Sequence, residues 1–117
     1  MTALEIRVAS QEEIISDVLH AVNSGVEAKE DIYTFLTYEA LHRTLTPKRI
    51  AIINAMAGRG VLSMREVARL VGRDFKGVHT DLVALLNIGL IDRDPSGGVI
   101  LPFDELRIDI SLHAHAA

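Results

Sequence analysis

The chain has 117 residues and a formal net charge of −4, and it contains no cysteine. Disulfide bonds and cysteine-ligated zinc are therefore excluded, and a cytoplasmic protein is the simplest expectation. The N-terminal sequence shows no signal-peptide pattern, and no apolar run approaches the ~20 residues that span a bilayer. With only 4% aromatic residues, the core of one small domain must be built from aliphatic side chains.

Charge is distributed unevenly along the chain. Residues 1–46 contain 3 Lys and Arg against 8 Asp and Glu, residues 47–93 contain 8 against 4, and residues 94–117 contain 1 against 4. A basic middle between acidic flanks indicates a surface for an anionic partner such as nucleic acid. Ordinary surface charge would give the same counts if the middle lacked a recognisable architecture.

The first 45 residues predict alternating strands and helices. Alternation of apolar and polar residues predicts a strand at 3–9. Ser10 and Glu13 form a capping-box pattern that begins a helix at 10–25. The apolar face of this helix consists of Ile14, Ile15, Val18, Leu19 and Val22. The next expected elements are an acidic loop at 26–31, a short strand at 32–36 and a helix at 37–45.

Three helices are predicted in the basic middle, at 46–57, 63–71 and about 74–88. Thr46 followed by Pro47 is typical of a helix start. Ser63 with Glu66 forms a second capping box, and Asp74 can cap the third helix. The residues expected in the core are Ile50, Ile53 and Ala57 from the first helix, Val67, Leu70 and Val71 from the second, and Phe75, Val78, Leu82, Leu85 and Leu86 from the third.

Strands are predicted after the third helix. The segment "LIDRDPSGGVILP" indicates a hairpin, and "ELRIDISL" alternates as a last strand at 105–112. Three helices followed by a hairpin form a winged helix-turn-helix. The predicted fold is α+β and mainly helical, with an N-terminal strand and helix arm at 1–45, a winged helix-turn-helix at 46–102, and a C-terminal strand and tail at 103–117.

The third predicted helix leaves a polar stripe outside the core. A helix in the DNA major groove reaches the base edges with its first turns, where Lys76, His79 and Thr80 lie. Gly77 costs about 1 kcal/mol of helix stability relative to Ala, which close approach to the DNA backbone or to the preceding helix could offset. The predicted base-reading residues are Lys76, Gly77, His79 and Thr80.

Four arginines are predicted to bind the DNA backbone or the minor groove. Arg65, Arg69 and Arg73 are spaced by four, so they fall roughly on one side of the second helix, where phosphate contacts supply affinity and register. Arg93 precedes the hairpin turn, where a wing places a cation against the minor groove. Asp81 would repel phosphates unless it pairs with a local cation or accepts a hydrogen bond from cytosine.

The central sequence resembles a known group of regulators. "SMREVARLVGRDFKGVHTDLVALLNIGLIDRD" looks like the core of bacterial winged helix-turn-helix regulators of the MarR and ArsR type, although the cysteine ligands typical of ArsR proteins are absent. The residues that carry the pattern are Val78, Leu82, Leu85, Gly89, Leu90 and Ile91. "LTPKRIAIINAMAGRGVLSMREVARLVGRD" with "DELRIDISL" is similar to a small prokaryotic family of predicted regulators, whose members are often suspected to be antitoxins.

The expected function is that of a sequence-specific DNA-binding transcriptional regulator that acts as a repressor. The family resemblance extends this to the autoregulating antitoxin of a toxin–antitoxin operon. The alternative is a protein-interaction winged helix that neutralises a basic toxin without reading DNA. No catalytic, cofactor or metal motif is predicted, and His113 and His115 on a tail do not close a metal site.

The terminal strands predict how the chain assembles. A single amphipathic strand leaves its backbone edge unpaired, so the strands at 3–9 and 105–112 are expected to pair within one chain or across a two-fold axis. Helix-turn-helix readers commonly bind two half-sites roughly 34 Å apart. The expected partners are double-stranded DNA, a second copy held by the terminal strands and the helices at 10–25 and 37–45, and a toxin protein bound by the acidic arms, with no membrane.

Overall fold

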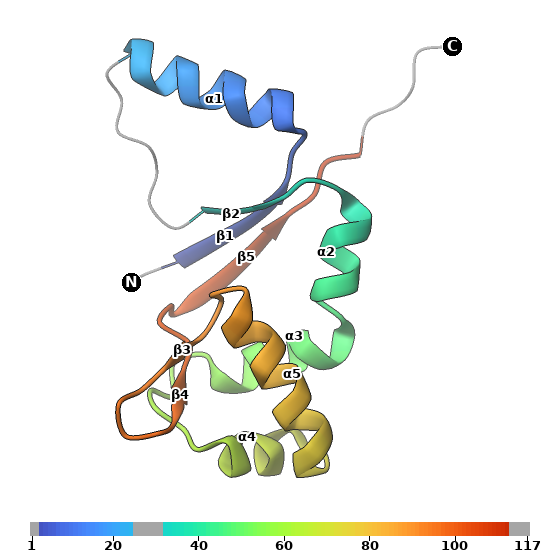
Figure 1. The fold of residues 1–117 in the computed structure, drawn as a ribbon, viewed down its shortest axis with the longest axis vertical. Coiled ribbons are helices and arrows are strands. Elements are labelled where there is room, and N and C mark those ends of the chain that lie inside the picture. The colour runs from blue at the N-terminus through green and yellow to red at the C-terminus, as the bar shows by residue number, and fades with distance from the viewer. Residues whose placement is uncertain (1–2, 25–31, 113–117) are drawn as a thin grey trace. The chain divides into compact units, whose positions relative to one another are not determined.

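The computed structural model describes residues 3–24 and 32–112, which fold as an α+β protein with five helices (Figure 1). The chain divides into two compact units. The helical unit comprises Arg43–Glu105, and the sheet unit comprises Ala3–His42 with the C-terminal segment that begins at Leu106. No helix within the described ranges combines the length and apolar content needed to cross a membrane.

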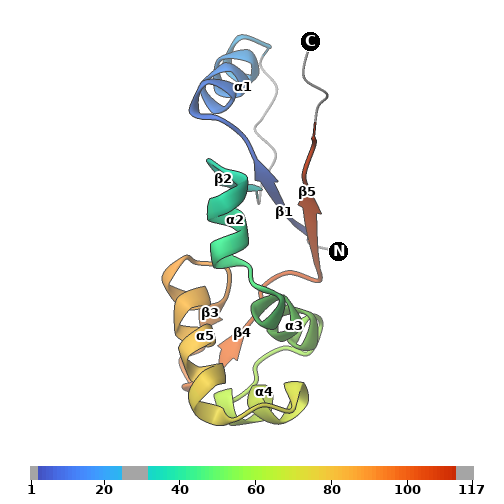
Figure 2. The same ribbon diagram turned by 90° about the vertical axis from the view of Figure 1, so that its right-hand side faces the viewer.

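The helical unit contains three helices and a hairpin (Figure 2). The helices are α3 (Pro47–Met56), α4 (Met64–Val71) and α5 (Phe75–Asn87), and the hairpin pairs β3 (Asp92–Arg93) antiparallel with β4 (Val99–Ile100). These elements bury an aliphatic core that includes Leu45, Ile52, Met56, Val67, Val78, Leu82, Leu85, Leu90, Ile91 and Val99. The predicted helix positions and the predicted hairpin are confirmed.

Each helix of this unit begins at its predicted cap. Thr46 Oγ1 accepts a hydrogen bond from the Arg49 backbone N–H at 3.3 Å, ahead of Pro47. The Ser63 hydroxyl accepts from the Glu66 backbone at 3.1 Å, and the Glu66 carboxylate accepts in return from the Ser63 backbone at 3.1 Å. These bonds satisfy backbone groups that a helix start leaves without partners, which fixes where the helices start.

The prediction of burial is wrong for some residues of α3 and α4. In α3 the buried residues are Ile52, Ile53 and Met56, whereas Ile50 is 38% exposed. In α4 the buried pair is Val67 and Ala68, and Leu70 is 45% exposed. Periodicity failed because aliphatic residues occur on more than one face of these short helices, so the tertiary contacts selected the buried face.

In α5 the prediction is correct for Val78, Leu82 and Leu85, which are buried, and wrong for Phe75. Phe75 is the first residue of the helix and is 36% exposed. Because the first turn extends past the packed part of α5, a residue there can continue the apolar spacing without joining the core.

A third short stretch of extended chain supports the hairpin. Leu62, between α3 and α4, forms an antiparallel bridge with Val99: each backbone N–H donates to the other's carbonyl, at 2.9 and 2.8 Å. Gly98 permits this approach, because a Cβ there would lie 2.7 Å from Val61 Cγ1 and 2.8 Å from the Leu62 carbonyl oxygen. No pattern in the sequence predicts this bridge.

The sheet unit contains a three-stranded sheet. Its elements are β1 (Ala3–Val8), α1 (Gln11–Ser24), β2 (Ile32–Phe35), α2 (Tyr38–Thr44) and β5 (Glu105–Asp109), and the strand order is β2-β1-β5. The first two strands are parallel, with Ile6 opposite Tyr33 and Val8 opposite Phe35. The terminal strands therefore pair within one chain, which was the first of the two expected arrangements. The loop predicted at 26–31 lies outside the described residues.

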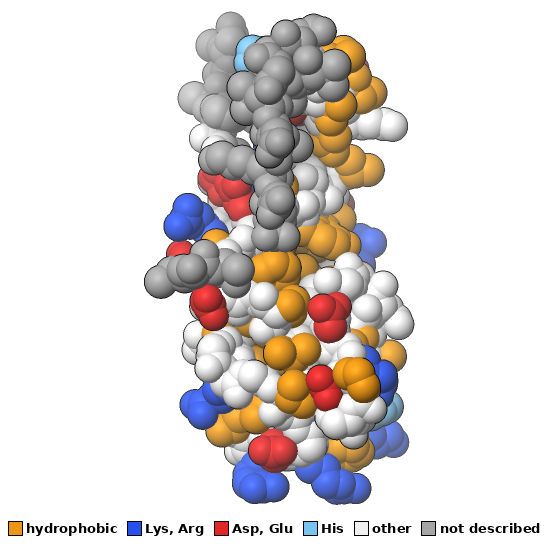
Figure 3. All heavy atoms as spheres, turned by 90° about the vertical axis from the view of Figure 1, so that its left-hand side faces the viewer, with side chains coloured by type: hydrophobic (Ala, Val, Ile, Leu, Met, Phe, Trp, Pro, Cys, Tyr) orange, Lys and Arg blue, Asp and Glu red, His pale blue; other side chains and the backbone are white. Residues whose placement is uncertain are grey.

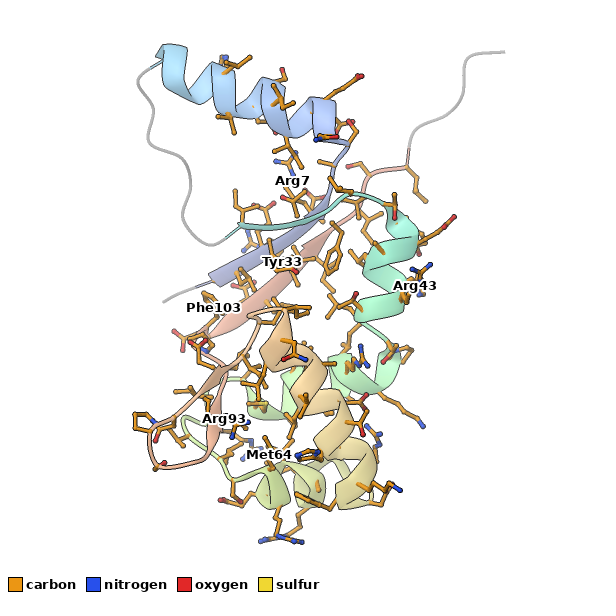
Figure 4. The ribbon with its side chains drawn as sticks, in the orientation of Figure 1. Arg7, Tyr33, Arg43, Met64, Arg93 and Phe103 are labelled. Carbon is orange, nitrogen blue, oxygen red and sulfur yellow. The ribbon has the colours of Figure 1, made fainter. Side chains whose placement is uncertain are left out.

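The helix α1 keeps most of its apolar face exposed. Ile15, Val18 and Leu19 have exposed fractions of 53%, 56% and 56%. An ion pair of 2.9 Å joins Arg7 on β1 to Asp17 on α1, and Figure 4 shows Arg7 directed toward that helix. These three aliphatic side chains are spaced three and four residues apart, so they lie on one side of the helix and leave it apolar toward solvent.

We predict that Gly98→Ala lowers the free energy of unfolding by about 1–3 kcal/mol, the usual cost of overpacking. Urea denaturation measures this loss. Adding Val61→Ala removes the nearer side-chain atom but leaves the Leu62 carbonyl in place, so the double variant should recover only part of the stability. Complete recovery would contradict the role given to the backbone contact.

Candidate nucleic-acid interface

The first turns of α5 present polar side chains to solvent. Lys76, His79 and Thr80 are exposed, and Gly77 between them is half-buried. The Thr80 hydroxyl donates to the Lys76 carbonyl at 3.1 Å, so its oxygen is left to accept hydrogen bonds. The stripe therefore offers an ammonium group, an imidazole and a hydroxyl oxygen along one side of a helix start.

Basic side chains are also exposed on other elements of the helical unit. Figure 3 shows Lys and Arg side chains gathered at the end of the helical unit that carries α4. Arg65 and Arg69 on α4 are exposed, and Arg93 is exposed on the hairpin (Figure 4). These three predicted phosphate ligands are thus accessible from solvent.

Arg65 also makes a specific contact with an aromatic ring. Its guanidinium carbon lies 4.4 Å from the centroid of Phe75, within the range of a cation–π interaction. The His79 ring, one turn along α5, lies 5.7 Å from the same ring, centroid to centroid. Arg65, Phe75 and His79 form an aromatic cluster at the junction of α4 and α5. Sequence reasoning missed Phe75 as a surface residue, because its spacing matched the core.

Asp81 is held by two arginines. Arg49 Nε donates to Asp81 Oδ1 at 3.0 Å, and Arg73 Nη1 donates to Asp81 Oδ2 at 2.9 Å. Arg49 also donates to the Thr44 carbonyl at 3.1 Å. The three charged side chains are only 14–23% exposed. In this triad of Arg49, Asp81 and Arg73, two arginines pair with the acidic residue that lies beside the exposed stripe of α5.

The triad sets the ionisation of Asp81. Burial disfavours the carboxylate, but hydrogen bonds and charge from Arg49 and Arg73 outweigh burial and lower the pKa of Asp81 below its ordinary value of 3.8. At neutral pH the triad therefore consists of one carboxylate between two guanidinium groups, with one net positive charge. Arg49 was not predicted as part of the site, and the role of Arg73 toward phosphate stays a prediction.

Gly77 faces the triad and the cap of its own helix. A Cβ at Gly77 would lie 3.1 Å from Arg73 Nη2 and 3.3 Å from Asp74 Oδ1. The Asp74 carboxylate accepts a hydrogen bond from the Gly77 backbone at 2.9 Å. The glycine thus leaves room for the paired arginine and the capping carboxylate, so the close approach predicted at Gly77 is made by side chains between α4 and α5.

An open groove of about 600 Å³ lies beside the triad. It is lined by the starts of α3 and α5: Thr46, Pro47, Lys48, Arg49, Arg73, Gly77, Thr80 and Asp81. The exposed Lys48 adds an unpredicted positive charge. Two helix N-termini at one groove add partial positive charge, because their first backbone N–H groups point outward.

The hairpin tip is ordered by a local turn. The Asp94 carboxylate accepts hydrogen bonds from the backbone and the hydroxyl of Ser96. The hydrogen bond from the Ser96 hydroxyl, followed in size by the bond from the Ser96 backbone N–H, lowers the pKa of Asp94. Gly97 adopts a φ of 98°, which a residue with a side chain rarely adopts, and closes the turn through a bond to the Asp94 carbonyl at 2.9 Å.

In the part of the chain that the structure describes, no group of three or more His, Asp or Glu side chains comes together as metal ligands would. His20 on α1 and His42 on α2 are exposed to solvent. The pair His113 and His115 lies outside the described residues.

The sequence matches one known protein family. A family model named HVO_A0114 matches residues 44–108, which is more than half of the chain. The chain belongs to the HVO_A0114 family. The matched region of this HVO_A0114 protein contains α3, α4, α5, the hairpin and most of β5. No curated protein and no solved structure matches the sequence. Membership names no activity, so the resemblance to MarR and ArsR regulators stays a prediction.

We predict that Asp81→Asn lowers the free energy of unfolding by about 1–3 kcal/mol at neutral pH, because it weakens two charged hydrogen bonds that are mostly shielded from water. Since the folded-state pKa of Asp81 is lowered, its contribution is complete above the unfolded-state pKa and is lost as the pH falls through the folded-state value. The difference between the two proteins should therefore shrink under acidic conditions.

Chemical denaturation between about pH 7 and about pH 2 measures this difference. Asp92→Asn is the matched control, because Asp92 is exposed on β3 and its curve should parallel that of the unsubstituted protein. If the deficit of Asp81→Asn stays constant over the whole range, the triad is not the source of the stability.

Proposed function

We propose that the protein is a sequence-specific DNA-binding transcriptional regulator whose helical unit is a winged helix-turn-helix. The observation that carries this proposal is the exposed stripe of Lys76, His79 and Thr80 in the first turns of α5. A recognition helix contacts base edges from that part of its length. We expect it to act in the cytoplasm as a repressor.

The order of elements supports the winged helix-turn-helix. α3 is followed by the single-residue bridge at Leu62, then α4, α5 and the β3–β4 hairpin. In this assignment α4 and α5 form the helix-turn-helix, and the hairpin is the wing. The bridge between Leu62 and Val99 holds the base of the wing against the chain that precedes α4.

Charge around α5 fits a duplex backbone. Arg65, Arg69 and Arg93 are exposed, and Lys48 lies at the groove between the starts of α3 and α5. Phosphate contacts by such cations supply most of the sequence-independent affinity. Arg73 differs, because its bond with Asp81 makes it better suited to position α5 than to supply an unpaired cation.

A second function rests on a separate surface. The acidic Glu12 and Glu13 in the first turn of α1 are exposed and suit a basic protein partner, so the protein could neutralise a basic toxin. An autoregulating antitoxin would combine both functions. The rival function, toxin binding without DNA reading, predicts no preference for any DNA sequence.

A homodimer completes the proposal. Two half-sites about one DNA turn apart require two reading helices. Because β1 and β5 are already neighbours within one sheet, the strands need no exchange between subunits. The apolar face of α1, with Ile15, Val18 and Leu19, is then the surface through which we expect two copies to associate.

The DNA-binding proposal predicts different defects for two double variants. His79→Ala with Thr80→Ala should reduce the preference for the DNA upstream of the gene over scrambled DNA, since a good base contact contributes about 1–3 kcal/mol of discrimination. The dependence of DNA affinity on salt concentration should persist in this variant. Arg69→Ala with Arg93→Ala should keep the preference and flatten the slope of log K against log salt by about two units.

Fluorescence anisotropy over a range of salt concentrations measures both properties, and each double variant serves as the control for the other. Equal affinity of the unsubstituted protein for upstream and scrambled DNA would contradict the proposal and favour the toxin-binding alternative. A basic partner encoded beside the gene, added and omitted in the same assay, tests that alternative directly.

The dimer proposal predicts that Leu19→Lys produces a monomer at micromolar concentration, because it places a charge in the apolar face of α1. Sedimentation equilibrium measures the mass. Ser16→Lys is the matched control, since Ser16 is exposed on the same helix, and this variant should remain dimeric. An unsubstituted protein that sediments as a monomer would overturn the proposed assembly.

A further inference from the structure

The aromatic cluster at the start of α5 places an apolar group where a reading helix meets DNA. Phe75 is 36% exposed, and its position is fixed from two sides. The Arg65 guanidinium stacks on the ring at 4.4 Å, and the Asp74 cap binds the Gly77 backbone at 2.9 Å, so the first turn begins at one defined residue.

The neighbours of Phe75 determine what the ring can contact. Lys76, His79 and Thr80 are polar and exposed, and each can form hydrogen bonds with base edges or phosphates. Phe75 can offer only an apolar surface. In the major groove, the C5-methyl group of thymine is the apolar feature that distinguishes the bases, and phenylalanine is among the residues that contact it.

We propose that Phe75 is a specificity-determining residue that contacts the C5-methyl group of a thymine in the bound DNA, with Arg65 stacked on the ring as its positioning residue. The inference depends on the proposed DNA-binding function and names thymine as one of the bases that the protein recognises. A guanidinium that stacks on the ring also keeps its N–H groups free to bind phosphate or a neighbouring base.

The test removes the methyl group from the DNA instead of the ring from the protein. The region upstream of the gene is amplified once with dTTP and once with dUTP, because uracil pairs like thymine and lacks only the C5-methyl group. The unsubstituted protein should bind the uracil duplex more weakly, by about fourfold for each methyl group contacted, which corresponds to the burial of one CH₂-sized group.

Two variants separate Phe75 from general effects of uracil on DNA shape. Phe75→Ala should bind the thymine duplex more weakly and should be indifferent to the replacement of thymine by uracil. Leu70→Ala is the matched control, since Leu70 is an apolar residue of α4 that is 45% exposed, and it should retain the full methyl effect. Circular dichroism verifies that both variants fold.

A cross-linking measurement needs no variant. DNA that carries 5-iodouracil in place of thymine has a photoreactive iodine where the methyl group was. After irradiation, trypsin cleaves the chain after Arg73, Lys76 and Arg93, which separates residues 74–76 from residues 77–93. The proposal expects the cross-linked nucleotide on residues 74–76, the peptide that contains Phe75.

The possible failures are distinct. If neither the thymine nor the uracil duplex binds in preference to scrambled DNA, the proposed function fails and the inference fails with it. If the protein prefers the upstream DNA but binds both duplexes equally, or if Phe75→Ala keeps the full methyl effect, DNA binding stands and the role of Phe75 is wrong. Cross-links confined to residues 77–93 would also exclude Phe75.

Discussion

The triad of Arg49, Asp81 and Arg73 connects the parts of the helical unit that carry the candidate interface. One carboxylate on α5 binds an arginine from the first turn of α3 and another from the chain that links α4 to α5. Because unpaired charges with so little exposure would be costly, the two contacts favour a single arrangement of the three helices. The direction of α5, and so of its exposed stripe, depends on this arrangement.

The residues around the triad contribute in two ways: some carry exposed positive charge, and Gly77 allows a close approach. The triad's two arginines leave one net positive charge and are mostly shielded from solvent, whereas Lys48, Arg65 and Arg69 are exposed and so are better placed to attract an anionic partner. Gly77 keeps the first turn of α5 close to the paired side chains. The same turn thus faces the triad on one side and solvent on the other, and a change on the inner side would alter what the outer side presents.

Local signals in the sequence predicted much of the fold. The caps at Thr46, Ser63 and Asp74 involve residues three apart, and the hairpin turn is formed by neighbouring residues. Pairing of Asp81 with a local cation was one of two expected alternatives, but Arg49 could not be predicted as a partner, because it is 32 residues away in the sequence. The bridge at Leu62 joins too few residues to produce an alternating pattern.

Within the candidate site, sequence predicted the exposed side of α5 but not its environment. Lys76, His79 and Thr80 were identified because they lie opposite the buried spacing of that helix. Phe75 shared the buried spacing, so only the structure places it at the surface. A helix terminus is where such errors are expected, since the pattern continues beyond the residues that other elements cover.

The bridge between Leu62 and Val99 separates the hairpin into a fixed base and a variable tip. The base is held by backbone bonds and by the close approach at Gly98, so few side chains are compatible with it. Among the described residues, the hydrogen bonds of the tip, from Asp94 to Gly97, are those of its own turn. Insertions and exchanges there would leave the core unchanged, so the reach and charge of the hairpin can be altered without disturbing the framework that carries it.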